Sequence, residues 1–219
     1  STLFPYTTLF RSRTGSLAQD LGQARKNIYY HQYNSAEKNL HNLLKSEPTN
    51  LDAWYWLSQA CFEMEQPQKF IDTLRMAPAQ LAEEPLFKTI KGQVLLKENK
   101  KDSATLYFDQ ALKATKQKNA FILSAIANAH IQEKPGDGVY AIELLNKAIK
   151  RDKKNPALYT MLGDAYRKIN NGSEAYKMYS QALIIDERYA AAAHKLGKIF
   201  FSQDRKSTRL NSSHRTGSR

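Results

Sequence analysis

The feature that most constrains this chain is a motif of about 34 residues that recurs through its middle. The copy from Pro156 contains two helical faces, each marked by apolar or small residues three or four positions apart, with the turn 170–172 between them. This spacing is that of one face of an α-helix. A pair of short helices cannot bury both of its faces, so the copies are expected to stack into one continuous core. The residues that mark the two faces are Tyr159, Leu162, Tyr166, Ala175, Tyr179 and Ala182.

Copies of the motif start near residues 17, 51, 85, 120, 156 and 190, and the last is half a repeat. In the copy from Pro156, positions 7, 8, 11, 20, 24 and 27 hold Leu162, Gly163, Tyr166, Ala175, Tyr179 and Ala182. This pattern resembles the tetratricopeptide repeat. Two residues depart from the motif. In the copy from Leu51, Phe70 stands where the family has a small residue, and in the copy from Pro156, Glu187 stands where it usually has proline. The resemblance covers about residues 17–203 and implies an all-α fold, a right-handed superhelical solenoid of antiparallel helix pairs.

Several local details follow from the same frame. Gly163 lies inside a helix, where glycine costs about 1 kcal/mol relative to alanine, so we expect a close helix crossing there. The Asn-Asn-Gly sequence 170–172 predicts a positive φ that ends the first helix, and Ser173 is the expected N-cap of the second. Pro78 falls within an expected second helix, which should therefore end near Met76 or kink. A two-residue insertion is assigned to the loop 134–138.

The two ends of the chain lack this periodicity. The strings STLFPYTTLFRS at the start and DRKSTRLNSSH near the end resemble translated sequencing-library adapters, and RTGS occurs at both 13–16 and 215–218. We therefore divide the chain into an adapter-like tail (1–16), the repeat domain (17–203) and a second adapter-like tail (204–219). The tails hold several of the cations behind the formal net charge of +12. On this interpretation the chain is a fragment without its native N-terminus, so its compartment is unknown, and cytoplasmic and periplasmic bacterial locations both stay open.

Residue types that perform catalysis or bind metals do not gather in any recognisable motif. The single cysteine excludes a disulfide framework and a multi-cysteine metal site, and the sequence has no Gly-rich phosphate loop and no HExxH pattern. His130 and Cys61 both fall at position 11, which is a packing position. Acidic residues such as Asp52 and Glu63 are assigned to a charged, solvated face. We therefore predict no catalytic, cofactor-binding or metal-binding residues, no enzymatic activity, and no membrane span within the chain.

The resemblance implies that the first helices of the repeats line a concave groove that receives a peptide or a helix of another protein. The family's groove positions here mix apolar side chains, expected to be exposed anchors, with amides that can bond a peptide backbone. They lack the repeated Lys/Asn/Arg set with which some members clamp a C-terminal carboxylate. The candidate partner-binding residues are Tyr55, Gln59, Phe62, Gln93, Leu96, Phe121, Asn128, Ile131, Asp164 and Arg167.

Two alternatives stay open. The first is a nucleic-acid-associated basic helical-repeat protein, because cations between Lys100 and Lys154 fall at turns and second helices and could form a basic strip along one edge of the solenoid. A protein partner is favoured over nucleic acid. The second is the repeat region of a larger enzyme or membrane-associated protein. In addition, the helix near 190–203 lacks its partner helix, so we expect it to expose Leu196, Ile199 and Phe200 and to promote self-association.

Overall fold

The computed structural model describes residues 15–201, and this part of the chain is all-helical, without strands. In chain order its elements are α1 (Gly15–Tyr29), α2 (Tyr33–Ser46), α3 (Leu51–Glu63), α4 (Pro67–Leu74), the 3-10 turn η1 (Ala79–Leu81), α5 (Pro85–Lys97), α6 (Lys101–Ala114), α7 (Ala120–Gln132), α8 (Gly138–Arg151), α9 (Pro156–Lys168) and α10 (Gly172–Ile185), followed by a helix over 190–201. The predicted all-α solenoid is confirmed.

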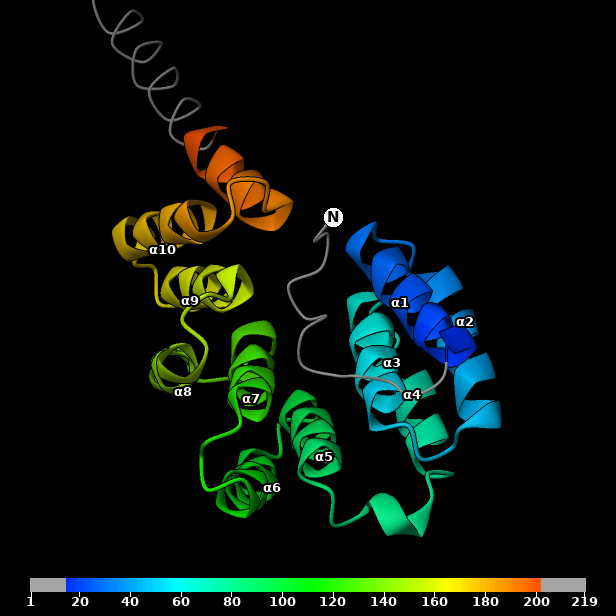
Figure 1. Cartoon of the computed structure of the whole chain (residues 1–219). Helices are drawn as coiled ribbons and strands as arrows, with labels where there is room; N and C mark the ends of the chain where they lie inside the picture. The colour runs from blue at the N-terminus through cyan, green and yellow to red at the C-terminus, as the bar shows by residue number, and fades with distance from the viewer. Residues whose placement is uncertain (1–14, 202–219) are drawn as a thin grey trace, which may run out of the picture.

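The helices form antiparallel pairs that stack into one curved row (Figure 1). The first helices of the pairs, α1, α3, α5, α7 and α9, lie on the inner side of the curve, and each contacts the next. The second helices lie on the outer side. The row curls enough that the helix 190–201 comes back toward α1 (Figure 1). The curl therefore brings the two ends of the described row toward each other (Figure 1).

Four of the turns within the pairs share one conformation. Three residues connect the helices, and the middle one has a positive φ: 58° at His31, 57° at Glu65, 62° at Asn99 and 61° at Asn170. The following amide then donates to a carbonyl five residues earlier, as at Asn171, whose N lies 2.8 Å from the oxygen of Tyr166. This left-handed residue is a common way to end a helix. The recurrence explains why these pairs all reverse direction in the same way.

The turn 170–172 differs in detail from the sequence prediction. The positive φ belongs to Asn170, as predicted for this segment, but Gly172 is already the first residue of α10 and has no positive φ. The predicted cap at Ser173 is wrong, because the Oδ1 atom of Asn171 accepts a hydrogen bond from the backbone N of Glu174. The cap lies two residues earlier because the three-residue turn ends at Asn171.

The connection between α7 and α8 contains the predicted insertion. It spans residues 133–137, which is five residues where the other pairs have three. It has no residue with a positive φ, and Asp137 begins the next helix by accepting hydrogen bonds from the backbone N of Val139 and Tyr140. The backbone N of Asp137 donates to Nδ1 of His130 at 3.0 Å. His130 is buried between the rings of Phe108 and Tyr140, which confirms it as a packing residue.

Close helix crossing occurs at the same position in two repeats. A Cβ atom at Gly163 would lie 2.4 Å from Cε1 of Tyr179, and one at Gly92 would lie 2.4 Å from Cε1 of Phe108. Both rings are fully buried. The crossing predicted at Gly163 is therefore confirmed, because glycine at repeat position 8 makes room for the aromatic ring at position 24.

The second pair is the irregular one. The helix α4 ends at Leu74, two residues before the predicted Met76, and Pro78 begins the turn η1. Phe70, which replaces a small residue of the motif, is fully buried against Trp54 and Phe62.

The predicted tails lie almost wholly outside the described residues. The exceptions are Gly15 and Ser16, which form the start of α1. Four of the six predicted repeat starts, Leu51, Pro85, Ala120 and Pro156, are the first residues of α3, α5, α7 and α9. Within residues 15–201, none of the helices combines the length and the apolar character that a bilayer crossing requires.

Candidate functional site

The inner side of the curve contains a cavity of about 630 Å³. Its walls come from α1, α2 and α3 on one side, the end of α7 on another, and the helix 190–201 across the opening. Four aromatic side chains, Tyr29, Tyr33, Tyr55 and Trp56, line it together with His31, Glu63, His194, Lys195 and Lys198. This cavity is large enough for several side chains of another molecule.

Only part of the predicted groove faces this cavity. Tyr55, Gln59 and Asn128 line it, whereas the other predicted site residues do not. Tyr55 is 6% exposed and Phe121 is 4% exposed, and their rings contact each other with centroids 5.1 Å apart. Leu96 and Phe62 are buried as well, and Ile131 is half-buried. The expectation that Tyr55, Phe62, Leu96 and Phe121 form an open row of anchors is therefore wrong. The rings of Tyr55 and Phe121 cover each other, and Phe62 packs against Phe70 of α4.

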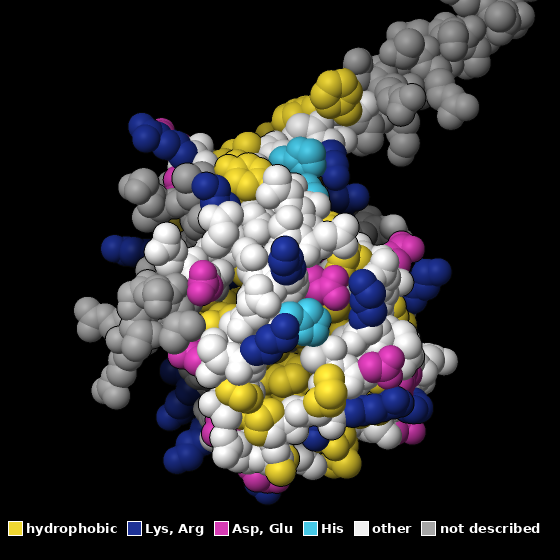
Figure 2. Space-filling view, turned by 90° about the vertical axis from the view of Figure 1, so that its right-hand side faces the viewer, with side chains coloured by type: hydrophobic (Ala, Val, Ile, Leu, Met, Phe, Trp, Pro, Cys, Tyr) yellow, Lys and Arg dark blue, Asp and Glu magenta, His cyan; other side chains and the backbone are white. Residues whose placement is uncertain are grey.

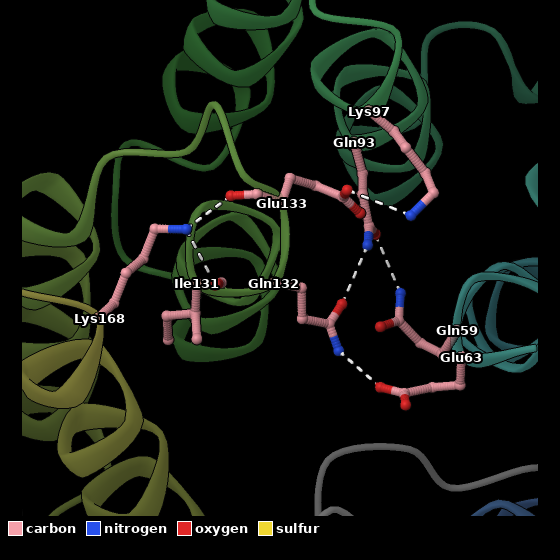
Figure 3. Close-up of polar contacts among 8 residues, drawn as sticks. All are labelled: Gln59, Glu63, Gln93, Lys97, Ile131, Gln132, Glu133 and Lys168. Carbon is pink, nitrogen blue, oxygen red and sulfur yellow. Dashed lines mark hydrogen bonds and ion pairs between the residues drawn. The ribbon is translucent and has the colours of Figure 1, made fainter. Parts of the chain in front are cut away.

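The predicted amides bond mainly to one another (Figure 3). Gln59 Nε2 donates to Gln93 Oε1 at 3.0 Å, and Gln93 Nε2 donates to Gln132 Oε1 at 3.2 Å. Gln132 Nε2 in turn donates to Glu63 Oε1 at 3.2 Å, and Asn128 Nδ2 donates to Gln59 Oε1 at 3.1 Å. This set, which we call the amide network, joins α3, α5 and α7. Buried amides need such partners, since an unpaired one costs about 1–3 kcal/mol.

Two lysines extend these polar contacts toward α9 (Figure 3). Lys97 Nζ lies 3.3 Å from Glu133 Oε2, and the Glu133 side chain is almost completely buried. Lys168 Nζ donates to the backbone oxygens of Ile131 and Glu133, at 3.1 and 2.6 Å. It therefore satisfies carbonyls at the end of α7 that have no helical partner. Partial burial lowers the pKa of Lys168, although Glu133 and Asp137 oppose this shift.

The last two predicted residues, Asp164 and Arg167, lie on α9, and neither lines the cavity. Asp164 accepts hydrogen bonds from Tyr179 Oη at 2.7 Å and from Lys195 Nζ at 2.7 and 2.9 Å. It thereby ties the helix 190–201 to α9. Arg167 is exposed. Asp164 thus holds the wall of the cavity in place and does not itself face a partner.

Sequence reasoning missed most of the cavity wall. Tyr29, His31 and Tyr33 surround the first turn, in the repeat whose first-helix signature is weakest, and Trp56 lies beside a groove position and not on it. The one available signal was the run of aromatic residues and histidine at 29–33, which the motif does not require.

Asp52 also departs from the predicted solvated face. Its Oδ1 atom is buried without a hydrogen bond among the described residues. Burial raises the pKa of this carboxyl to about 6, although the charge of Arg25 lowers it. The Arg25 guanidinium itself lies over the ring of Trp56, 5.0 Å from its centroid. Asp52 therefore belongs to the interface between α1 and α3, and its assignment to a solvated face is wrong.

Cys61 and His130, the two side chains considered for reactive or ligand chemistry, have structural roles. Cys61 is buried, and burial raises the pKa of its thiol to about 12, so it is a poor nucleophile. Burial also lowers the pKa of His130. Among residues 15–201, no three His, Cys, Asp or Glu side chains are placed to hold a metal ion.

Comparison with known proteins defines the class. The Tetratricopeptide repeat family model matches residues 28–94 and 134–199, which together exceed half of the chain. The chain therefore belongs to the tetratricopeptide-repeat family, whose members are generally non-catalytic and whose fold is that of a protein-interaction scaffold. No curated protein matches the sequence.

One solved structure supports the fold with a TM-score above 0.5, and two others are similar at lower scores. TTC0263, a thermophilic tetratricopeptide-repeat protein of Thermus thermophilus, is 14% identical and has a TM-score of 0.62, with 84% of this chain and 99% of that protein covered. YrrB, described as a tetratricopeptide-repeat protein with an unusual peptide-binding site, is 16% identical with a TM-score of 0.47, covering 80% and 89% of the two chains. MamA is 19% identical with a TM-score of 0.43, covering 80% and 94%.

Proposed function

We propose that this protein is a non-catalytic scaffold that holds a short segment of a partner protein in the concave cavity. The observation that carries the proposal is the wall of four aromatic side chains around a space of about 630 Å³, on the side of the solenoid where the first helices gather. Aromatic side chains next to polar groups are the usual anchors of a protein interface. Tyr55, Gln59 and Asn128 stay in the proposed site, joined by Tyr29, Tyr33 and Trp56.

We take the occupant to be an extended segment, because such a segment can place two or three side chains inside the cavity while its backbone stays at the opening. At that opening, Lys198 lies one turn after Lys195 and His194. Lys195 is paired with Asp164 and Glu63 lies on the same wall, so these groups do not require a charged residue in the segment.

The test is selection of binding peptides from a displayed library, followed by variants of the wall. Trp56→Ala and Tyr29→Ala are preferred to changes at Tyr55 or Phe121, because the latter two are buried and their loss would also unfold the chain. We expect each variant to weaken the selected peptides about tenfold, equivalent to ~1.4 kcal/mol. Tyr176→Ala, an exposed tyrosine on the outer helix α10, is the matched control and should leave binding unchanged.

Binding that survives the combined Trp56→Ala and Tyr29→Ala changes would place the partner elsewhere and refute the cavity as the site. Far-UV circular dichroism of each variant separates a lost contact from a lost fold. A selected peptide should also quench or shift the fluorescence of Trp56 when it binds, and Trp56→Phe should remove that signal while retaining most of the affinity.

A further inference from the structure

A second cleft lies on the other side of the molecule, between the outer helices α6 and α8 of neighbouring repeats. It is larger than the concave cavity, about 1070 Å³, and shares no lining residue with it. Leu112 and Tyr140 supply apolar surface, and Asp109 is the one acidic residue on the wall. The remaining charged lining residues are Lys113, Lys116, Lys147, Lys150 and Arg151. We call these five side chains the basic cleft cations.

The arrangement of these cations is set by two local structures. Lys147, Lys150 and Arg151 recur at spacings of three and four on α8, so they share one face of that helix. Lys113 lies in the last turn of α6, and Lys116 follows in the turn toward α7. That turn holds two successive residues with positive φ, Lys116 at 51° and Gln117 at 52°. Such a conformation costs free energy for residues other than glycine, and it often marks a functional segment.

The basic cleft cations are not neutralised by the protein itself. Within residues 15–201, none of the five forms an ion pair with a carboxylate. The single polar contact in this set joins Lys147 Nζ to Gln117 Oε1 at 2.9 Å. Elsewhere lysines do find partners, as Lys69 does with Glu37 and Lys195 with Asp164. Like charges one turn apart destabilise a helix by a few tenths of a kcal/mol per pair, so α8 retains a repulsion that a bound anion would relieve.

The charge distribution is local. Figure 2 shows the face over α1 to α4, where Lys and Arg side chains are interspersed with Asp and Glu and hydrophobic side chains gather near the lower end. That mixed surface does not select an anionic partner, whereas the cleft, with five cations and one acidic residue, does. The cleft between α6 and α8 therefore gathers five cations against one acidic residue, which is a local excess of positive charge.

We propose that the cleft between α6 and α8 binds an acidic, partly apolar segment of a partner protein, at a site separate from the concave cavity. The cleft is too long for a single phosphate group and presents cations along both walls. Its apolar surface at Leu112 and Tyr140 matches an apolar side chain set between acidic ones. Asp109 can accept a hydrogen bond from a peptide N–H.

Nucleic acid fits the same cleft less well. A duplex carries its charge on a broad surface and cannot enter the space between two neighbouring helices. A single strand is usually held by several aromatic side chains on which its bases stack, and this wall offers one, the half-buried Tyr140.

The test measures binding of a fluorescein-labelled peptide of about twelve residues in which Glu and Asp alternate with Leu, against the whole chain. The doubly reversed variant Lys147→Glu, Lys150→Glu should bind it at least about tenfold more weakly. The control Lys153→Glu, Lys154→Glu makes the same change in net charge at exposed residues just after α8 that do not line the cleft. It should bind within about twofold of the unaltered protein.

Equal losses in the two variants would show that net charge alone attracts the peptide, and this would overturn the proposal. A uridine oligonucleotide of equal length is the competing probe; tighter binding of that probe, with the same sensitivity to Lys147→Glu, Lys150→Glu, would also overturn it. Trp56→Ala should leave acidic-peptide binding unchanged, so failure at this cleft and failure of the concave cavity are distinguishable.

Discussion

Replacing Gly163 by alanine tests the close crossing of α9 and α10 with a single added methyl group. The added Cβ would lie 2.4 Å from Cε1 and 2.7 Å from Cδ1 of Tyr179, well inside ordinary contact distance. The ring cannot retreat, because Tyr179 is fully buried and its hydroxyl donates to Asp164 at 2.7 Å. Overpacking costs about 1–3 kcal/mol, and a 2.4 Å approach to a fixed ring puts this site at about 2–3 kcal/mol. Alanine regains about 1 kcal/mol of helix propensity. We expect a net loss of about 1–2 kcal/mol.

The measurement is thermal unfolding followed by far-UV circular dichroism, where this loss should lower the Tm by roughly 2–8 °C. Gly172→Ala is the matched control. Nothing lies within 4 Å of a Cβ at Gly172, and its φ is not positive, so alanine should be neutral or slightly stabilising. When Tyr179 is first replaced by leucine, the ring is absent. Adding Gly163→Ala to Tyr179→Leu should then lower the free energy of unfolding by less than Gly163→Ala does in the unaltered protein. A Gly163→Ala protein that melts at or above the unaltered protein would refute the argument that glycine is there to admit the ring.

Three further predictions follow from other parts of the structure. The folded-state pKa of Asp52 lies above its ordinary value, so stability should fall as pH rises from about 4 to about 6. In urea unfolding, Asp52→Asn should stabilise the protein by about 1 kcal/mol at pH 7.5 and should have no effect at pH 4. The figure of about 1 kcal/mol allows for the partial exposure of Asp52 and for its favourable interaction with the helix dipole. Phe200 is 55% exposed and Phe201 is 76% exposed, so light scattering at high concentration should detect self-association. Phe200→Glu should weaken this association and Lys198→Glu should not. A protein that stays monomeric at all concentrations would contradict the prediction. Removing residues 1–14 and 202–219 should shift the Tm by less than about 2 °C, and a larger drop would show that they stabilise the fold.

The sequence was sufficient for the helix pairs because their information is local. The starts at Leu51, Pro85, Ala120 and Pro156, the longer loop after α7 and the crossing at Gly163 all follow from spacing within one repeat. Buried packing at His130 followed in the same way. The small error at the cap of α10 arose because several residues of one turn are chemically able to cap a helix.

The candidate site was less predictable because it depends on contacts between repeats that are far apart in sequence. Position within the motif says which side chains point inward, but not how tightly the row curls. The contact between Tyr55 and Phe121, and the hydrogen bond from Asn128 to Gln59, join residues more than sixty positions apart. These contacts bury the expected anchors, and they leave Tyr29, Tyr33 and Trp56 to face the cavity instead.

The amide network has a consequence for how this molecule comes apart under load or denaturant. In an ordinary solenoid each repeat interacts only with its neighbours, so the chain can open from its ends one repeat at a time. Here Asn128 and Gln132 on α7 reach past α5 to Gln59 and Glu63 on α3. These hydrogen bonds join residues 51–132 into one block, in which α3 and α7 must separate together. Amide exchange should report one common opening free energy across this block, with lower values outside it, in α1 and α2 and toward the helix 190–201. The block should also resist the stretching that other helical repeats allow.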